Sequence, residues 1–189
     1  MNKAVIILIP LVILGVLVIG AFGIYNGLIS SQEEAKTAWS QVENQYQRRA
    51  DLIPNLVETV KGFAAQEKSV LEEVTRLRSQ WGEARQTGDI NKSLQAAQGM
   101  ESALGRLMVV VERYPDLKSN QNFMKLQDQL EGTENRISVE RKRFNESVLN
   151  YNKKIRTFPG ALFAGLFGFE RMPLFEAEPE AKKAPKVKF

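Results

Sequence analysis

The chain has 189 residues, a formal net charge of +4 and no histidine or cysteine. The missing residue types exclude the usual proton carrier near neutral pH, the thiolate nucleophile, disulfides and the common zinc ligands. The basic residues are interspersed with acidic ones, so the sequence lacks the clustered basic face of a nucleic-acid-binding protein. We therefore expect a protein that is not an enzyme, needs no cofactor and binds no nucleic acid.

An apolar run near the N-terminus predicts a transmembrane helix. Residues 4–24 read AVIILIPLVILGVLVIGAFGI, and at a rise of about 1.5 Å per residue they span a hydrocarbon core of about 30 Å. We expect a short tail at residues 1–3, a membrane helix at residues 4–27, and contact with the lipid bilayer through residues 4–24. The alternative is a cleaved signal peptide, but its apolar region is normally about 7–15 residues long.

The side of the membrane that holds the rest of the chain stays open. Lys3 precedes the apolar run, and Lys36 stands alone after it, close to Glu33 and Glu34. Counting basic residues favours an inside N-terminus by a narrow margin, because basic flanks tend to stay cytoplasmic. We expect a single-pass protein of the cell (inner) membrane, with the side of its soluble domain undetermined.

A long amphipathic helix is expected directly after the membrane segment. Ser30 and Ser31 each precede a glutamate by three residues, which is the spacing of a capping box, so a new helix should begin there. Apolar residues then recur in a 3-4 alternation that predicts one helix over about residues 30–81. The stripe consists of Leu28, Ala35, Trp39, Val42, Tyr46, Ile53, Leu56, Val60, Phe63, Val70, Val74, Leu77 and Trp81.

Pro54 lies inside this stripe and marks either a kink or a chain reversal, because proline costs about 3 kcal/mol in a helix interior. We favour the kink, since a reversal would expose Leu52 and Ile53 in a turn, and turns are usually polar or rich in glycine. A kinked helix of about 50 residues would carry the chain about 75 Å away from the bilayer. A chain reversal at Pro54 would instead bring Phe158 back toward the lipid.

Two further helices complete the predicted domain. Residues 81–91 lose the apolar pattern and contain glycines, which indicates a connecting loop. Apolar stripes then predict helices at about residues 92–114 and 120–158, separated by a turn at Pro115. The expected fold class is all-α. One N-terminal transmembrane helix is followed, over residues 28–158, by an antiparallel up-and-down bundle of long helices, of four-helix-bundle type with coiled-coil-like packing.

The C-terminal part is expected to contain a short aromatic apolar segment, residues 159–175, and a charged, disordered tail, residues 176–189. The apolar segment is too short to span a bilayer but long enough to lie on one or to cover part of the bundle. Bulky aromatic side chains suit packing against protein, including subunit contacts, as well as a membrane surface, so both stay open. The interaction or interfacial candidates are Leu162, Phe163, Leu166, Phe167 and Phe169.

Charged side chains that fall in phase with the apolar stripes are the most informative local feature. A buried ion costs several kcal/mol to desolvate unless it is paired, so we expect ion pairs across helices that fix their register. The functional alternative is a metal site, but di-metal sites in helical bundles use Glu-x-x-His and the chain has no histidine, so we expect no metal. The predicted buried ionic residues are Arg49, Glu67, Glu112, Glu134 and Arg141.

Three strings of the sequence resemble signature blocks of the LemA family: RRADLIPNLVETVKGFAAQE, VVERYPDLKSNQNFMKLQDQLEGTENRISVERKRFNESVLNYN and FPGALFAGLFGF. The resemblance covers nearly the whole chain from Tyr25 to Phe175. It implies a bacterial-type protein with one membrane helix and a helical bundle, and it brings no catalytic residues. Because a magnetosome-formation protein belongs to the family, the resemblance also implies work on membrane organisation. The acidic segment GLISSQEEAK departs from the strongly basic flank of many relatives.

We expect the protein to be a membrane-anchored helical scaffold or interaction protein that self-assembles as a homo-oligomer and organises the membrane or unknown protein partners. The alternative is a peripheral lipid-binding or membrane-remodelling module, in which the aromatic segment inserts beside Lys153, Lys154 and Arg156. Another alternative is an adaptor of a membrane protease, which leaves no recognisable signal in the sequence.

Overall fold

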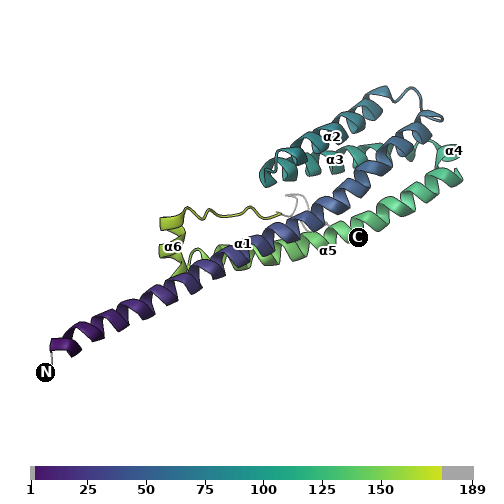
Figure 1. The fold of residues 1–189 in the computed structure, drawn as a ribbon. Coiled ribbons are helices and arrows are strands. Elements are labelled where there is room, and N and C mark those ends of the chain that lie inside the picture. The colour runs from purple at the N-terminus through teal and green to yellow at the C-terminus, as the bar shows by residue number, and fades with distance from the viewer. Residues whose placement is uncertain (1–2, 176–189) are drawn as a thin grey trace, which may run out of the picture. The chain divides into compact units, whose positions relative to one another are not determined.

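The computed structural model describes residues 3–175, which are helix or connecting loop with no strand among them. The all-α expectation is therefore confirmed for this part of the chain. Residues 1–2 of the predicted tail and the predicted disordered tail at 176–189 fall outside the described residues. The helices in Figure 1 are α1 Lys3–Lys61, α2 Lys68–Gln86, α3 Ile90–Val111, α4 Pro115–Lys118, α5 Gln121–Lys154 and α6 Gly160–Phe167.

The described residues divide into two compact units. The first unit contains residues 3–38 and 144–174, and the second contains residues 39–143 and 175. Helices α1 and α5 contribute to both units, whereas α2, α3 and α4 belong to the second unit and α6 belongs to the first.

Helix α1 begins in the apolar run and continues without a break into the helical domain. The side chains of residues 8–20 are exposed, and α1 is long and apolar enough to cross a membrane. The predicted restart at Ser30 and Ser31 is wrong, because both residues lie inside α1. Ser31 Oγ donates hydrogen bonds of 3.0 Å to the carbonyl oxygens of Gly27 and Leu28, which satisfies its hydroxyl within a helix.

Pro54 also lies inside α1, which continues through it to Lys61. Proline has no N–H, so the carbonyl oxygen of Ala50, four residues earlier, loses its helical donor. Arg78 of α2 supplies a replacement, because its Nε donates a hydrogen bond of 2.8 Å to that oxygen. The chain therefore does not reverse at Pro54.

The chain instead leaves the helix at residues 62–67, so the single helix predicted over residues 30–81 is two helices, α1 and α2. The backbone N–H groups of Phe63 and Ala64 donate to the carbonyl oxygen of Val60 at 3.0 and 2.8 Å, which closes a tight turn. Phe63, which the stripe placed in the core, is exposed, whereas Ala64 is buried. A turn that keeps its buried residues at helical spacing cannot be distinguished from a helix by periodicity.

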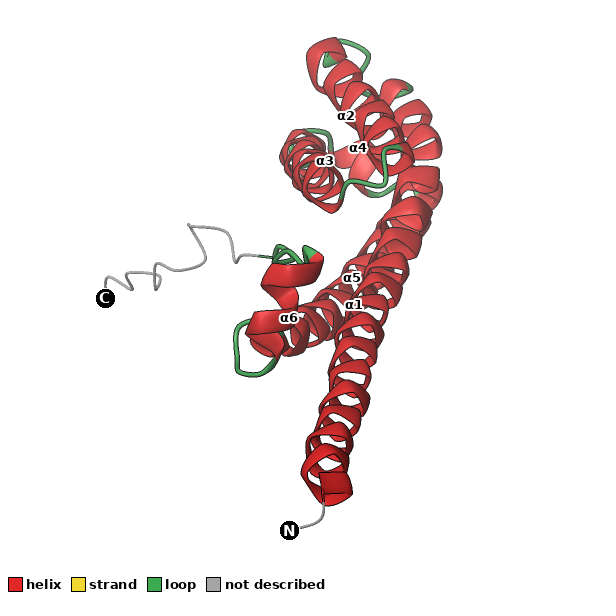
Figure 2. Ribbon diagram, turned by 60° about the vertical axis from the view of Figure 1, so that its left-hand side comes forward, coloured by secondary structure: helices red, strands yellow, loops and turns green. Residues whose placement is uncertain are grey.

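Helices α2 and α3 pack against each other as a hairpin in the second unit (Figures 1 and 2). The predicted loop at residues 81–91 is shorter than expected, because Trp81 is buried and α2 continues to Gln86. Asp89 then caps α3, since its side chain accepts hydrogen bonds from the backbone N–H groups of Asn91 and Lys92.

The remaining helix ends lie close to those predicted. Helix α3 ends at Val111, and Pro115 begins the single turn α4. Proline is tolerated at a helix start because the first N–H groups of a helix have no acceptor within the helix. Asn120 caps α5, because its Oδ1 accepts hydrogen bonds from the backbone N–H groups of Asn122 and Phe123. Helix α5 ends at Lys154 rather than at residue 158.

The segment after α5 folds back onto it within the first unit. Asn152 Nδ2 donates to the carbonyl oxygen of Met172 at 2.9 Å, and the Met172 N–H donates to Asn152 Oδ1 at 3.0 Å. Tyr151 Oη donates to the carbonyl oxygen of Glu170 at 2.8 Å. The core that α6 covers consists of Leu28, Tyr151, Ile155 and Ala164, with Phe163, Phe169 and Met172 packed against it.

Candidate functional site

Three helices bring five polar and charged side chains together in the second unit. Helix α1 contributes Tyr46 and Arg49, α3 contributes Glu101, and α5 contributes Glu134 and Arg141. Tyr46 and Arg49 are three residues apart and Glu134 and Arg141 are seven apart, so each pair lies on one face of its helix. We call these five residues the central ionic network.

Glu101 connects the three helices of the network. Its Oε1 accepts a hydrogen bond from Tyr46 Oη at 2.8 Å and another from Arg141 Nη2, and it lies 3.6 Å from Arg49 Nη1. Arg141 also donates to Tyr46 Oη, and its guanidinium lies over the rings of Tyr46 and Phe175, 5.5 and 4.8 Å from their centroids. The side chain of Glu101 is therefore fixed by contacts from α1 and α5.

Arg49 carries the buried positive charge of the network and is 4% exposed. Its Nη2 donates to the carboxylate of Glu134, and its Nε donates to Thr133 Oγ1 at 3.4 Å. The side chain of Glu134 is 51% exposed, so this pair extends from the core to the surface. Two guanidinium groups and two carboxylates balance in formal charge, which offsets the cost of removing them from water.

The environment of the network shifts two of its pKa values. Burial raises the pKa of Tyr46 well above its usual range, and the negative charge of Glu101 raises it further. Burial alone would lower the pKa of Arg141, but the hydrogen bond and charge of Glu101, together with Tyr46, outweigh it and raise that pKa. The network therefore holds Tyr46 neutral and Arg141 charged across the physiological range, which suits a structural role better than proton transfer.

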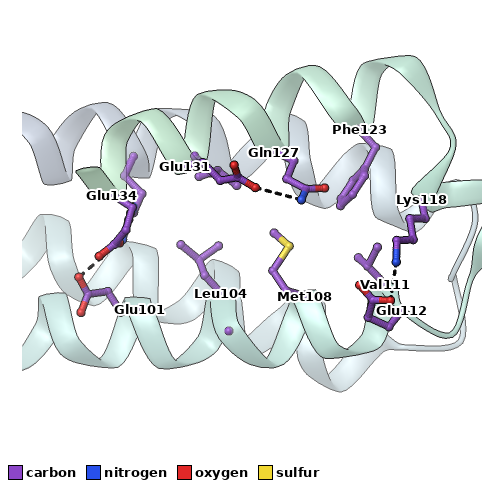
Figure 3. Close-up of a pocket in the computed structure, with 13 residues that line it drawn as sticks. Glu101, Leu104, Met108, Val111, Glu112, Lys118, Phe123, Gln127, Glu131 and Glu134 are labelled. Carbon is purple, nitrogen blue, oxygen red and sulfur yellow. Dashed lines mark hydrogen bonds and ion pairs between the residues drawn. The ribbon is translucent and has the colours of Figure 1, made fainter. Parts of the chain in front are cut away.

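A groove of about 440 Å³ borders the network between α3 and α5. Figure 3 shows Leu104 and Met108 on one side and Phe123 on the other, all pointing into the space between the helices. At the rim, Lys118 Nζ donates to Glu112 at 2.6 Å and Gln127 Nε2 donates to Glu131 at 3.1 Å (Figure 3). The groove thus offers an apolar wall with carboxylates at its edge, which can receive an apolar or cationic group.

Among residues 3–175 the structure contains no group of three or more His, Cys, Asp or Glu side chains placed to hold a metal ion. The carboxylates of Glu101 and Glu134 are instead bonded to arginines. The chemistry of the network in this part of the chain is therefore that of ion pairing between helices.

The structure distributes the predicted ionic residues over three places. Arg49, Glu134 and Arg141 belong to the central ionic network. Glu67 lies at the α1–α2 turn, where it pairs with Arg113 at 3.2 Å and accepts a hydrogen bond from Tyr114 Oη at 2.9 Å. Burial and Glu67 raise the pKa of Tyr114.

Glu112 does not belong to the buried set, contrary to expectation. It follows the last residue of α3, and its side chain is 65% exposed and paired with Lys118 at 2.6 Å. Glu112 keeps helical backbone angles, but it comes one residue after the buried Val111, and this turns its side chain about 100° away from the apolar stripe of α3.

The predicted interfacial residues divide between the two sides of α6. Phe163 and Phe169 pack against the core of the first unit, whereas Leu162, Leu166 and Phe167 are exposed. The sequence stripe gives no basis for this division, because residues 158–169 carry no polar side chain that would mark the outer face.

Glu101, the centre of the network, is absent from the predicted set. A signal for it exists, because Glu101 lies four residues after Ala97 and three before Leu104, in phase with the apolar stripe of α3. The same reasoning that found Arg49 and Arg141 would have identified it. The ring of Phe175, which lies over Arg141, has no such signal, since it comes from a non-helical segment.

Comparison with known proteins gives a consistent result. The model of the LemA family matches residues 38–189. Magnetosome protein MamQ of Magnetospirillum gryphiswaldense is 30% identical over 178 residues, which cover 82% of this chain and 65% of that protein. Protein LemA of Metamycoplasma hominis is 24% identical over 169 residues, which cover 86% and 75% of the two chains. The chain thus spans 65% of the length of its magnetosome relative.

Proposed function

The chain belongs to the LemA family, and from this premise we propose that it is a membrane-anchored helical scaffold that self-associates and organises the membrane or partner proteins around it. Family membership and the long apolar helix α1 together describe a membrane-associated helical protein. We place it in the cell (inner) membrane as a single-pass protein. Beyond this, we propose that the protein self-associates and that it organises the membrane or partner proteins.

The continuity of α1 is the observation that supports this proposal most. One helix contains both the exposed apolar residues 8–20 and the buried residues Leu28, Ala35, Trp39 and Val42. No loop separates the apolar run from the first core positions of the domain. Such an arrangement suits a protein that presents a folded surface at the bilayer, because the anchor and the domain share one element.

The central ionic network supports a structural role rather than a catalytic one. Its carboxylates accept hydrogen bonds from arginines and Tyr46, and these bonds link α1, α3 and α5. Buried polar contacts of this kind fix the register of helices. By analogy with relatives named as magnetosome proteins, we propose that the domain holds other components in place.

We further propose an antiparallel up-and-down bundle of four helices, made of α2, α3, α5 and the part of α1 that follows the apolar run. In this bundle α1 is kinked at Pro54. Contacts within the second unit support this arrangement. Arg85 Nη1 bonds Gln47 at 2.8 Å while Arg78 bonds Ala50, so α2 runs against α1. A proline in a helix interior removes one backbone hydrogen bond and favours a local bend.

Self-association is favoured by the anchor itself. Chains confined to one bilayer meet at a high effective concentration, so weak contacts suffice to assemble them. Exposed apolar side chains of α5, namely Met124 and Leu149, offer such contacts.

Light scattering coupled to size-exclusion chromatography tests this proposal on the detergent-solubilised full chain. After subtraction of the micelle, we expect a protein mass of at least two chains that falls as the sample is diluted. A single chain at every micromolar concentration, in several mild detergents, would overturn self-association and leave only an anchored monomer.

A further inference from the structure

Helix α6 has an outer surface that a soluble protein would normally not expose. Residues 158–169 read FPGALFAGLFGF, with no charged or hydrogen-bonding side chain. Leu162 is 66% exposed, Leu166 is 74% exposed and Phe167 is 53% exposed. Surface helices of soluble domains carry polar residues on the face away from the core. We call Leu162, Leu166 and Phe167 the outer face of α6.

The structure places helix α6 beside α1 within the first unit (Figures 1 and 2). The ring of Tyr25, which directly follows the run, lies 4.9 Å from the ring of Phe167 and 5.9 Å from that of Phe169. Leu28, three residues farther on, is buried with Ala164 of α6. Tyrosine at the end of a membrane helix is typical of the headgroup level.

The distances along α1 place α6 at the depth of the headgroups. Ile24 ends the apolar run, and Leu28 lies about 6 Å beyond it at 1.5 Å per residue. The headgroup layer extends about 5–7 Å on each side of the hydrocarbon core. Glu33 and Glu34 lie about 14 Å beyond Ile24, so these acidic side chains clear that layer. An interfacial helix buries its apolar face at this boundary.

Basic residues flank α6 along the chain of the first unit. Lys153 and Lys154 end α5, Arg156 follows them, and Arg171 comes shortly after α6, all of them exposed. Basic residues beside an apolar interfacial segment attract anionic headgroups. The basic charge and the apolar surface at this site therefore both favour a bilayer with anionic headgroups.

We infer that α6 is a second membrane contact, whose outer face inserts into the headgroup–acyl boundary of the bilayer that α1 crosses, while Lys153, Lys154, Arg156 and Arg171 contact its phosphates. The inference rests on the proposed anchoring by α1. It adds a second, laterally displaced attachment, so that the first unit is held to the bilayer at two points.

A second copy of the chain fits this surface less well than lipid. A helix of eight residues is about 12 Å long and about 10 Å wide, so its outer face offers on the order of 100 Å². A stable protein interface buries about 800 Å² on each partner. Contact between outer faces alone would therefore cover about an eighth of such an interface, whereas a bilayer can cover the whole outer face.

Site-directed spin labelling tests the inference on the full-length protein, because the chain has no cysteine that would take up label elsewhere. Leu166→Cys and, separately, Leu162→Cys carry a nitroxide in vesicles of phosphatidylcholine with phosphatidylglycerol as a minor component. Collision with oxygen, which enters lipid, is compared with collision with a water-soluble nickel chelate. Phe22→Cys in the apolar run is the lipid reference, and Val139→Cys on the exposed side of α5 is the water reference.

The inference predicts that labels at Leu166 and Leu162 resemble the label at Phe22, with nickel collision reduced several-fold below that at Val139. A label at Leu166 that collides with nickel as freely as the label at Val139 would overturn the inference while leaving the anchor intact. Shielding from both reagents would also overturn it and would place the outer face against protein. Free access of nickel to the label at Phe22 would instead remove the anchoring on which the proposed function depends.

Discussion

Arg78 donates a hydrogen bond of 2.8 Å from its Nε to the carbonyl oxygen of Ala50, the acceptor that Pro54 leaves without a helical donor. The bond connects α2 to α1 at an interior position where α1 cannot satisfy its own backbone. An unpaired buried carbonyl costs free energy comparable to a lost hydrogen bond, so Arg78 compensates for the proline. Within the second unit, Arg78 therefore replaces the hydrogen bond that Pro54 removes from α1.

This pairing predicts non-additive effects on stability. Arg78→Met should lower the free energy of unfolding by about 1–2 kcal/mol, because it removes a charge-assisted hydrogen bond and keeps most of the apolar stem. In a Pro54→Ala background the alanine N–H can bond the Ala50 carbonyl, so the same substitution should cost less. Denaturant unfolding of the single and double variants measures the coupling.

Arg76→Met is the matched control for this cycle. Arg76 is exposed and pairs with Glu73 at 3.9 Å on the same helix, so its replacement should change stability by less than about 0.5 kcal/mol. Equal costs of Arg78→Met with and without Pro54 would contradict the compensating role of Arg78.

The two carboxylates of the central ionic network should differ strongly in their contribution to stability. Glu101→Gln leaves Arg49 and Arg141 short of a buried counter-charge, and we expect a loss of roughly 3 kcal/mol. Glu134→Gln removes a half-exposed partner of Arg49, and we expect a loss below about 1 kcal/mol. Thermal unfolding of both variants in the same detergent gives the comparison, and equal losses would show that Glu101 is not the centre of the network.

The stability of the domain should fall at alkaline pH. Burial and Glu101 raise the pKa of Tyr46 in the folded chain, whereas an unfolded tyrosine has a pKa of about 10. Above that pH the unfolded chain releases a proton that the folded chain retains, so the free energy of unfolding decreases as pH rises. The pKa values of Tyr114 and Tyr151 are raised as well. Burial is the main cause for both, followed by Glu67 for Tyr114 and by the negative charge of Glu170 for Tyr151.

Tyr46→Phe isolates the contribution of one tyrosine. The variant should be less stable at pH 8, because Glu101 loses a hydrogen-bond donor. Its stability should nevertheless decline less steeply above pH 10, by up to about 1.4 kcal/mol per pH unit. Denaturant unfolding over pH 8–12 measures both slopes, and parallel slopes for the variant and the parent would contradict the neutral, buried phenol of Tyr46.

Two glycines of α6 should respond differently to substitution. A Cβ at Gly160 would lie 2.2 Å from the carbonyl oxygen of Lys154, so Gly160→Ala must displace the start of α6 from α5. A Cβ at Gly165 meets no atom within 4 Å, so Gly165→Ala should leave the helix in place. Hydrogen exchange of the α6 amides checks this. We expect faster exchange in Gly160→Ala only. If the α6 amides of Gly160→Ala were as protected as those of the parent, the close approach of Gly160 to the Lys154 carbonyl would not be needed to hold α6 in place.

The helices of this chain could largely be predicted from apolar periodicity, because the buried stripes of α3 and α5 follow helical spacing through whole helices. The turn at residues 62–67 could not, since Val60, Ala64 and Leu71 stay buried on both sides of it and preserve the spacing. A stripe records which residues are buried, and it does not record whether the backbone between them is helical. The false restart at Ser31 has a different cause, because the spacing of a capping box also occurs inside a helix, and there the Ser31 hydroxyl bonds the carbonyl oxygens of Gly27 and Leu28.

The turn at residues 62–67 also determines where the C-terminal segment of the chain lies. With one helix over residues 30–81, residues 159–175 would have ended far from the bilayer. Because α1 ends at Lys61, the chain reverses earlier, and α6 packs beside Tyr25 at the end of the apolar run. The apolar character of α6 could be predicted from its sequence, but its neighbour on α1 depends on a backbone turn that apolar periodicity does not mark. Gly62, directly after Lys61 in the last turn of α1, is the signal that could have located this turn.

Cryo-electron microscopy of the full-length protein in lipid nanodiscs large enough for several chains tests whether the protein is a membrane-anchored scaffold. We expect particles with more than one chain, each crossing the bilayer once through residues 8–24, with the helical domains outside and α6 at the lipid surface. Particles that contain one chain each, or an apolar run that lies outside the bilayer, would contradict a membrane-anchored scaffold.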